Sequence, residues 1–427
     1  MKNILLLGSG GRECTLAWKL SQSPLCGSFY IAPGNAGTGA YGINLPISYN
    51  DFEGIKKACI TYKIDIVIPG PEDPLVAGIY DFFKNDAALK HIIVAGPSKE
   101  GAQLEGSKAF SKKFMERHNI PTAAYKEFTA DSFEQGVAYI KRSEMPIVIK
   151  ADGLAAGKGV VIAQNSVEAV KAFRAMVMNE QFGAASKRVV IEQFLDGVEL
   201  SVFALTDGIN YILLPEAKDY KRIGEQDTGL NTGGMGAISP VPIADSEFMQ
   251  KVTDRIVVPT VNGLKAENIT YRGFIFFGLI KVKGEPYVIE YNCRMGDPET
   301  EVVIPRLQND LVELILKMNA GRLDEVKVVP HTKAAAAVML VSEGYPGDYA
   351  KGRVMTGFEK AKGSLLFHAG TIANGDNIVT NGGRVLAVTS YGDDLKQALA
   401  KSYENVELIK YEGKYYRRDI GWEFNKK

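Results

Sequence analysis

Residues 146–163 read PIVIKADGLAAGKGVVIA, which is an apolar run, a glycine-rich turn and a second apolar run. Short apolar runs bounded by glycine are typical of buried strands. The turn resembles a P-loop, but three residues rather than four separate Gly153 from Gly157, and Gly159 replaces the Ser or Thr that would bind magnesium. The stretch therefore predicts two strands joined by a glycine hairpin, not a P-loop.

Two lysines on this stretch point to a polyphosphate ligand. Lys150 ends the first predicted strand and supplies a fixed cation, and Lys158 lies on the hairpin. We expect the hairpin to act as a lid that folds over a triphosphate, because glycine lets the backbone approach a ligand closely. The alternative is an exposed hairpin tip with a solvated lysine.

A second predicted hairpin supplies candidate metal ligands. Residues 273–292 read as two strands that turn at Lys283-Gly284. Glu290 and Asn292 occupy alternate positions, so their side chains share one face, and oxygen ligands suit a magnesium ion that bridges phosphates. Arg294 has the same parity, and its guanidinium is suited to hold a phosphate or acyl-phosphate oxygen. The segment continues as RMGDPETE, which makes a merely polar sheet edge the poorer interpretation.

The first hundred residues alternate predicted strands with helix-like stretches, which indicates a parallel sheet covered on both faces. The strands are Asn3–Leu7, Phe29–Ala32, Ile64–Ile68 and His91–Ala95, and the helices are Glu13–Ser21, Phe52–Tyr62 and Val76–Lys84. Ligands of such sheets bind past the carboxyl ends of the strands. This edge receives the loops GSGGRE (8–13), APGNAG (32–37), PGPEDPL (69–75) and AGPSKEGAQLEGSK (95–108).

The glycine turn at residues 8–11 follows a strand and opens a helix, so its N–H groups are placed to face an anion. A dinucleotide fingerprint needs glycine at the sixth place of G-x-G-x-x-G, and this chain has Glu13 there. NAD and FAD are therefore disfavoured, and a phosphate or small polar ligand is favoured. A tight connection without a ligand remains the equal alternative.

The remaining segments extend the α/β pattern. We expect a helix over Ser107–His118, two strands around a turn in residues 188–205, and a small α+β unit from about residue 330. The quartet Asp219-Tyr220-Lys221-Arg222 precedes the glycine-dense loop DTGLNTGGMGA (227–237), which permits close approach to a substrate. Met235 within that loop is expected to pack rather than to bind.

Composition excludes several functional classes. The 427 residues carry 50 basic and 50 acidic side chains, so no charge excess points to nucleic acid or an anionic membrane. The 4 cysteines are far apart and the 4 histidines lack metal spacing, which disfavours a disulfide scaffold or a zinc enzyme. No apolar run is long enough to span a bilayer and no signal peptide is evident, so we expect a cytoplasmic protein.

Five motifs, in this order, resemble the phosphoribosylamine–glycine ligase family of the ATP-grasp superfamily: GSGGRE, PGPEDPL, IKADGLAAGKGV, NTGGMGA and IEYN-R-GDPET. The resemblance covers essentially the whole chain, including YPG (345–347), TNGGRVLAVT (380–389) and DIGW (419–422). It implies an α/β fold of several parts: an amino-terminal parallel-sheet domain of biotin-carboxylase-like, Rossmann type (1–103), the start of the ATP-grasp body (104–120), a lid (121–189), the catalytic body (190–328) and a small α+β carboxy-terminal domain (329–427).

The resemblance also implies the reaction. Glycine, 5-phosphoribosylamine and ATP give glycinamide ribonucleotide, ADP and phosphate, the second step of de novo purine synthesis. ATP would lie between lid and body. A carboxylate is a poor acyl donor until ATP turns it into an acyl phosphate, and this transfer needs metal and cations rather than an acid–base triad. The many Lys, Arg, Gly and Asp loops agree with that chemistry.

The implied site residues fall into four groups. ATP would contact Lys108, Lys150, Gly157, Lys158, Gly159, Glu192, Phe194, Leu195 and Glu199. The metal, Mg²⁺ or Mn²⁺, would be held by Glu290 and Asn292. The other substrates would contact Gly10, Gly11, Asn35, Pro71, Glu72, Asp73, Gly233 and Gly234, and the catalytic group would be Asp219, Lys221, Arg222 and Arg294. We expect the glycine turn to face the 5′-phosphate, the two acids to face ribose or amine, and the protein to be a monomer or weak dimer without nucleic-acid or membrane partners.

The chain departs from the family pattern at five positions: Cys14 and Tyr220 stand in place of histidine, Leu230 in place of proline, and Cys293 and Met295 in place of Val and Phe. Cys14 is expected to pack on a helix rather than to react. Three rival interpretations stay open. Another ATP-grasp ligase would share Lys150 and Glu290 but not PGPEDPL or NTGGMGA, a nucleotide-binding regulatory module would have a decayed site, and a dehydrogenase conflicts with Glu13.

Overall fold

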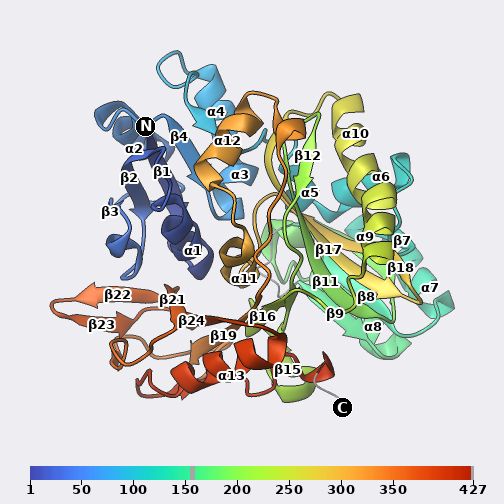
Figure 1. Cartoon of the computed structure of the whole chain (residues 1–427). Coiled ribbons are helices and arrows are strands. Elements are labelled where there is room, and N and C mark those ends of the chain that lie inside the picture. The colour runs from blue at the N-terminus through green and yellow to red at the C-terminus, as the bar shows by residue number, and fades with distance from the viewer. Residues whose placement is uncertain (154–158, 425–427) are drawn as a thin grey trace.

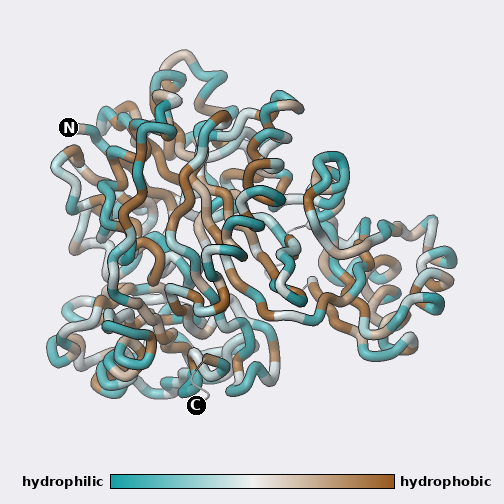
Figure 2. Tube along the Cα trace, turned by 45° about the vertical axis from the view of Figure 1, so that its right-hand side comes forward, coloured by the Kyte–Doolittle hydropathy of each residue, from teal (hydrophilic) through white to brown (hydrophobic). Residues whose placement is uncertain are grey.

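The computed structural model describes residues 1–153 and 159–424. Its strands form an amino-terminal sheet, two central sheets and a carboxy-terminal sheet, together with two smaller ones (Figure 1). Figure 2 shows apolar segments running through the interior and hydrophilic segments on the outside. Across the described residues, every helix is too short or too polar to cross a membrane.

The amino-terminal sheet is parallel, as predicted, with the order β3-β2-β1-β4-β5. Its strands are β1 (Lys2–Gly8), β2 (Cys26–Pro33), β3 (Ile43–Asn44), β4 (Ile66–Pro69) and β5 (Ile93–Val94). Its helices are α1 (Gly11–Leu20), α2 (Phe52–Thr61), α3 (Glu72–Ala77) and α4 (Ile79–Asn85). The carboxyl ends of β1 and β4 therefore lie side by side, which brings the glycine turn next to PGPEDPL.

One predicted helix of this part was wrong in its bounds. The chain was expected to be helical from Val76 to Lys84, but α3 already begins at Glu72, with Pro71 as its N-cap and two acids in its first turn. Acidic residues in a first turn interact favourably with the helix dipole, which the loop interpretation of PGPEDPL overlooked. Gly78, with φ +97°, then separates α3 from α4, because only glycine readily adopts this conformation.

The first central sheet has the antiparallel order β7-β10-β8-β9 and its own hydrophobic cluster. Its strands are β7 (Tyr125–Thr129), β8 (Ile147–Ala151), β9 (Val160–Ala163) and β10 (Arg188–Gln193), covered by α7 (Phe133–Arg142) and α8 (Ser166–Val177). Phe133 and Phe173 stack between the two helices, with ring centroids 5.3 Å apart. The predicted strand–glycine hairpin–strand arrangement is confirmed, since β8 pairs with β9.

The second central sheet has the order β12-β11-β17-β18. Its strands are β11 (Val198–Thr206), β12 (Tyr211–Leu213), β17 (Tyr271–Val282) and β18 (Glu285–Asn292), and β6 (Gly96–Pro97) also pairs with β17. The helices of this region are α5 (Gln103–Gly106), α6 (Lys108–Arg117), α9 (Ser246–Val252), α10 (Val258–Ala266), α11 (Thr300–Arg306) and α12 (Leu311–Asn319).

The predicted hairpin of β17 and β18 is confirmed, with Lys283 and Gly284 both at positive φ in the turn. The two strands predicted in residues 188–205 exist, but they are not partners. Strand β10 belongs to the first central sheet and β11 to the second, so the turn between them connects two sheets. Local sequence identified each strand. Its pairing partners depend on which neighbouring strands the tertiary fold places beside it.

The carboxy-terminal sheet has the order β13-β16-β19-β24-β21, with β25 also on β19. Its strands are β13 (Lys218–Asp219), β16 (Gly236–Ser239), β19 (Ala334–Ser342), β21 (Ser364–His368), β24 (Arg384–Gly392) and β25 (Lys414–Tyr415), packed on α13 (Leu395–Val406). Two small sheets are formed by β14 (Arg222–Gly224) with β15 (Thr228–Asn231), and by β20 (Val354–Met355), β22 (Thr371–Asn374) and β23 (Asn377–Thr380). Strands β13 and β16 thus join this sheet, although Ala217, just before β13, bridges to Ser201 of the second central sheet.

His368 links the carboxy-terminal sheet to the amino-terminal loops and should make stability pH-dependent. Burial lowers the pKa of its imidazole to about 4, below the ordinary value of 6.5. Between these values the unfolded chain binds the extra proton, so stability rises with pH across this window and is lost as pH falls through it. The full effect is roughly 3 kcal/mol. The free energy of unfolding of His368→Asn, measured with urea from pH 4 to 7, should decrease less with falling pH than that of the wild type. Equal pH dependence of the two proteins would contradict this.

Candidate active site

Three lysines and one buried glutamate gather between the two central sheets. Glu192 of β10 is 4% exposed, and its carboxylate lies 2.9 Å from Lys150 Nζ of β8 and 3.3 Å from Lys112 Nζ of α6. Lys150 Nζ also donates to the carbonyl oxygen of Ile289 on β18 at 3.4 Å, so it bridges the two sheets. Lys108, at the first position of α6, donates to the Gly153 carbonyl oxygen at 3.3 Å.

The charges of this cluster shift one another's pKa values. Burial lowers the pKa of Lys112 to about 8, although Glu192 opposes the shift. Burial also lowers the pKa of Lys108, against the attraction of Glu290. Burial would raise the pKa of Glu192, but the two lysines outweigh it and lower that pKa. The cluster therefore holds one carboxylate among several cations, an arrangement with positive potential available for a phosphate chain.

A second charged cluster lies along the edge of β11. Lys221 Nζ is 2.7 Å from Glu199 Oε2 and 4.0 Å from Asp219 Oδ1. The pKa of Lys221 is raised well above its ordinary value by Asp219, Glu199 and Glu290, which outweigh the opposing effect of burial. Burial raises the pKa of Asp219 against the attraction of Lys221. Sequence analysis placed Asp219 and Lys221 in one quartet, and the structure adds Glu199 to them.

Glu290 lies within the electrostatic reach of both clusters, since it acts on the pKa values of Lys108 and of Lys221. Glu290 and Asn292 are half-buried on β18, whereas Tyr291 between them is 2% exposed, so the predicted common face is confirmed. Asn292 is oriented so that its amide nitrogen donates to the Tyr291 carbonyl oxygen at 3.1 Å and to Glu105 Oε1 at 2.9 Å.

Arg294 extends from the same strand toward the amino-terminal sheet. Strand β18 ends at Asn292, so the predicted parity does not continue to Arg294. Its guanidinium instead contacts Glu72 Oε2 at 3.2 Å and Glu105 Oε1 at 2.7 Å. The attraction of these carboxylates outweighs burial and raises the pKa of Arg294. Arg294 therefore joins the carboxyl edge of the parallel sheet to the end of β18.

The glycine turn opens α1 as predicted, but carboxylates already face its first turn. Gly10 N donates to Glu13 Oε2 at 2.6 Å, and Arg12 N donates to Asp297 Oδ2 at 3.3 Å. Glu301 is fully buried beside Gly11, where any side chain would collide with its carboxyl group. Burial and Asp297 raise the pKa of Glu301 well above its ordinary value. A phosphate at this helix end would compete with these acids, so phosphate binding by Gly10 and Gly11 stays a prediction.

Other predicted substrate residues have structural partners. The Asn35 side chain is 7% exposed and donates to the carbonyl oxygens of Ser9 at 2.9 Å and His368 at 2.7 Å, so it fastens the glycine turn to the carboxy-terminal sheet. Pro71 caps α3, Glu72 pairs with Arg294, and Asp73 is exposed. Of the predicted residues in this loop, Glu72 is the one whose side chain contacts Arg294.

The remaining predicted residues lie in three other stretches of the chain. Gly233 N donates to Tyr345 Oη at 2.8 Å and its carbonyl oxygen accepts Arg384 at 2.7 Å, with Gly234 next to it. Arg222 donates to the Gly229 carbonyl oxygen at 2.8 Å, within its own hairpin. Phe194 and Leu195 are half-buried between β10 and β11. The Gly159 carbonyl oxygen accepts Ala151 N at 2.8 Å, whereas Gly157 and Lys158 lie outside the described residues.

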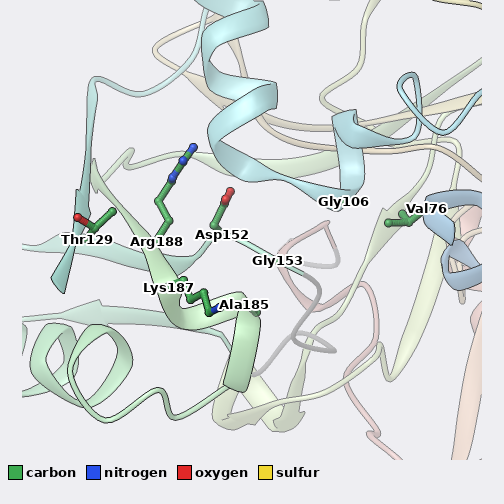
Figure 3. A pocket seen from close by; sticks show the side chains of 8 residues that line it. All are labelled: Val76, Gly106, Thr129, Asp152, Gly153, Ala185, Lys187 and Arg188. Carbon is green, nitrogen blue, oxygen red and sulfur yellow. The ribbon is translucent and has the colours of Figure 1, made fainter. Parts of the chain in front are cut away.

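A cavity of about 630 Å³ opens beside this glycine hairpin (Figure 3). Its lining residues are Val76, Gly106, Thr129, Asp152, Gly153, Ala185, Lys187 and Arg188. Asp152 accepts Ser107 Oγ at 3.0 Å and Ala109 N at 2.7 Å, which fixes the start of α6 and hence Lys108 at the cavity edge.

Three residues of the site escaped sequence analysis. Lys112 lies one helical turn after Lys108, and this i, i+4 spacing was an available signal. Glu105 is buried, accepts Cys293 N at 2.8 Å and pairs with Arg294, but nothing local distinguished it. Arg384, on β24 of the carboxy-terminal sheet, forms an ion pair with Asp297 at 2.9 Å. As expected, Cys14 and Met235 are fully buried packing residues, and burial raises the pKa of Cys14 to about 12.

The two central antiparallel sheets, with a parallel sheet before them, define the ATP-grasp class. The biotin carboxylase of Campylobacter jejuni shares this fold with a TM-score of 0.72 at 16% identity, over 97% of this chain and 92% of that chain. The chain belongs to the phosphoribosylglycinamide synthetase family, whose N, ATP-grasp (A) and C domain models match residues 2–105, 106–300 and 335–423.

Individual relatives agree with this assignment. The phosphoribosylamine–glycine ligase of Haemophilus influenzae is 48% identical over 425 residues, which are 98% of each chain. The crystal structure of phosphoribosylamine–glycine ligase from Thermotoga maritima has a TM-score of 0.85 at 36% identity, and the match covers 98% of this chain and 99% of that one.

Proposed function

We propose that this protein joins glycine to 5-phosphoribosylamine at the expense of ATP, giving glycinamide ribonucleotide, ADP and phosphate. The observation that carries the proposal is the position of Glu290. It follows Ile289, whose carbonyl oxygen accepts Lys150 Nζ at 3.4 Å, on the strand that leads to Arg294 and Glu72. Its charge also acts on Lys108 of one cluster and on Lys221 of the other. In this proposal one strand connects a phosphate-binding region to the region that receives the amine.

ATP would bind between the central sheets, with Lys108 and Lys150 on its phosphates. The neighbourhood of Glu192, Phe194, Leu195 and Glu199 would frame the nucleoside. We propose residues 121–189 as the lid, because their sheet has a hydrophobic cluster separate from the rest. Closure of such a lid keeps water away from a reactive acyl phosphate.

A divalent metal fits the face of β18. Glu290 offers a carboxylate and Asn292 an amide oxygen, whose nitrogen is already engaged by Glu105 and Tyr291. Magnesium is commonly held by one or two such ligands together with phosphate oxygens. We propose that Glu290 and Asn292 hold Mg²⁺ or Mn²⁺, which would neutralise charge on the transferred phosphoryl group. Lys150 and Lys221 supply further positive charge on either side.

The reaction would proceed in two transfers. A glycine carboxylate oxygen attacks the γ-phosphorus of ATP, which forms glycyl phosphate and releases ADP. The amine of phosphoribosylamine then attacks the glycyl carbonyl carbon, the C–N bond forms, phosphate leaves with the C–O electron pair, and the amine loses a proton. In this proposal Arg294 holds an oxygen of the acyl phosphate, and Asp219, Lys221 and Arg222 complete the catalytic group.

Phosphate release tests the proposal. Release should require ATP, glycine and phosphoribosylamine together and should yield one glycinamide ribonucleotide per phosphate. ATP binding without phosphate release would favour a regulatory module instead. Release with a different acid or amine, and none with this pair, would favour another ATP-grasp ligase.

Glu72→Ala should separate the amine site from the nucleotide site. Glu72 holds Arg294 at the edge of the parallel sheet and faces the proposed amine. Loss of a charge-assisted contact should raise KM for phosphoribosylamine about tenfold, while KM for ATP stays within twofold. Glu53→Ala is the matched control, since Glu53 lies in the first turn of α2 in the same region and is exposed. A rise in KM for ATP alone would place this loop in the nucleotide site.

A further inference from the structure

The last residues of the chain contact the loop that carries Asp219 and Lys221. We call residues 415–423 the brace and residues 218–231 the quartet loop. In Figure 1 the red carboxy-terminal end of the chain lies beside β15 of this loop. Tyr415 Oη donates to the Ile223 carbonyl oxygen at 2.9 Å, and Gln226 N donates to Asp419 Oδ2 at 2.6 Å. The brace includes the DIGW motif, to which the proposed reaction assigns no role.

Arg417 is the centre of the brace. Its side chain is fully buried, which is costly for a guanidinium unless every donor finds a partner. It contacts Asp419 Oδ1 at 2.8 Å and Oδ2 at 2.9 Å, Asp227 Oδ1 at 2.7 Å and the Arg222 carbonyl oxygen at 3.2 Å. Its guanidinium also lies 5.3 Å from the centroid of the Tyr220 ring. One buried cation therefore contacts both the start of β14, at Arg222, and the turn before β15, at Asp227.

Tyr220 and Lys218 attach the start of the quartet loop to the same brace. Tyr220 Oη donates to Glu423 Oε2 at 2.9 Å, and Lys218 Nζ lies 3.3 Å from Glu423 Oε1. Asp219 and Lys221 alternate with them, and Lys221 pairs with Glu199 at 2.7 Å and lies 4.0 Å from Asp219. Because side chains of an extended segment alternate between faces, contacts on the Tyr220 face set the position of the Lys221 face.

We propose that the brace positions the quartet loop for catalysis, with Arg417, Tyr220, Asp419 and Glu423 as positioning residues that act through Asp219 and Lys221. This inference rests on the proposed function, because kcat is measured for the proposed ligase reaction. The brace contributes no atom to the ATP cluster of Lys108, Lys150 and Glu192, which is built from α6, β8 and β10. Lys221 also pairs with Glu199 of the proposed nucleoside neighbourhood, so loosening the brace should lower kcat more than it changes KM for ATP.

The test uses the full chain with Tyr220→Phe, which removes one hydroxyl, and Asp419→Asn, which removes one charge from the Arg417 pair. We expect kcat to fall at least about tenfold, KM for ATP to change by a smaller factor than kcat, and hydrogen exchange of residues 222–231 to accelerate at least tenfold. Tyr411→Phe is the matched control, because the Tyr411 hydroxyl donates to the Val341 carbonyl oxygen at 2.9 Å within the same domain. It should leave both measurements unchanged.

The outcomes are separable. If both variants match Tyr411→Phe in kcat, or exchange of residues 222–231 stays at the wild-type rate, the positioning role is overturned. If wild-type protein releases no phosphate with glycine and phosphoribosylamine, the proposed function fails, while the exchange measurement still decides whether the brace holds the loop. Should Asp419→Asn not fold, Glu423→Gln replaces it, since Glu423 is 19% exposed and tolerates a neutral isostere better.

Discussion

Glu290→Gln is expected to lower kcat at least about a thousandfold while leaving the free energy of unfolding within about 1 kcal/mol of the wild type. Loss of a metal-binding carboxylate removes several kcal/mol of transition-state stabilisation. The amide keeps the size of the side chain, which packs over Gly278 on β17. Turnover at saturating Mg²⁺ and urea unfolding measure the two effects separately.

The matched control for this variant is Glu285→Gln at the other end of the same strand. Glu285 is 39% exposed and pairs with Lys251 at 3.0 Å, far along β18 from the charged clusters. Solvent screens such exposed ion pairs, so neither turnover nor stability should change much. Wild-type turnover by Glu290→Gln would remove Glu290 from the metal site.

Glu192→Ala is expected to cost about 3–5 kcal/mol of folding free energy, because it leaves Lys112 and Lys150 buried without a counter-ion. The side chains of Lys112 and Lys150 are 2% and 7% exposed, so water has little access to solvate their charges once the carboxylate is removed. Urea or thermal unfolding at pH 7 measures the loss. Activity should also fall, since the lysines of the proposed phosphate site lose their anchor.

An exposed carboxylate between two cations provides the comparison. Glu325 lies 3.0 Å from Lys317 and 2.6 Å from Arg322, but its side chain is 40% exposed. Glu325→Ala should destabilise the fold far less than Glu192→Ala, because solvent screens the exposed pairs. Equal losses for the two variants would mean that burial of Glu192 does not determine its contribution.

The sequence by itself determined the local structure and the types of chemistry. Alternating strands and helices identified the parallel sheet, the Lys283-Gly284 tip identified the β17–β18 hairpin, and strand alternation put Glu290 and Asn292 on one face. These features depend on backbone preferences and side-chain periodicity within a few residues, which any local window of sequence contains. The motif order was sufficient to identify the family.

The tertiary structure decided which charges meet. Arg294 pairs with Glu72 and Glu105, 222 and 189 residues away in the chain. Glu192 forms an ion pair with Lys112 as well as with Lys150, and β10 and β11 belong to different sheets. The brace contacts the quartet loop from the far end of the chain. Such partners are selected by packing and by the cost of burying an unpaired charge. That cost depends on the whole fold, so no local pattern records it.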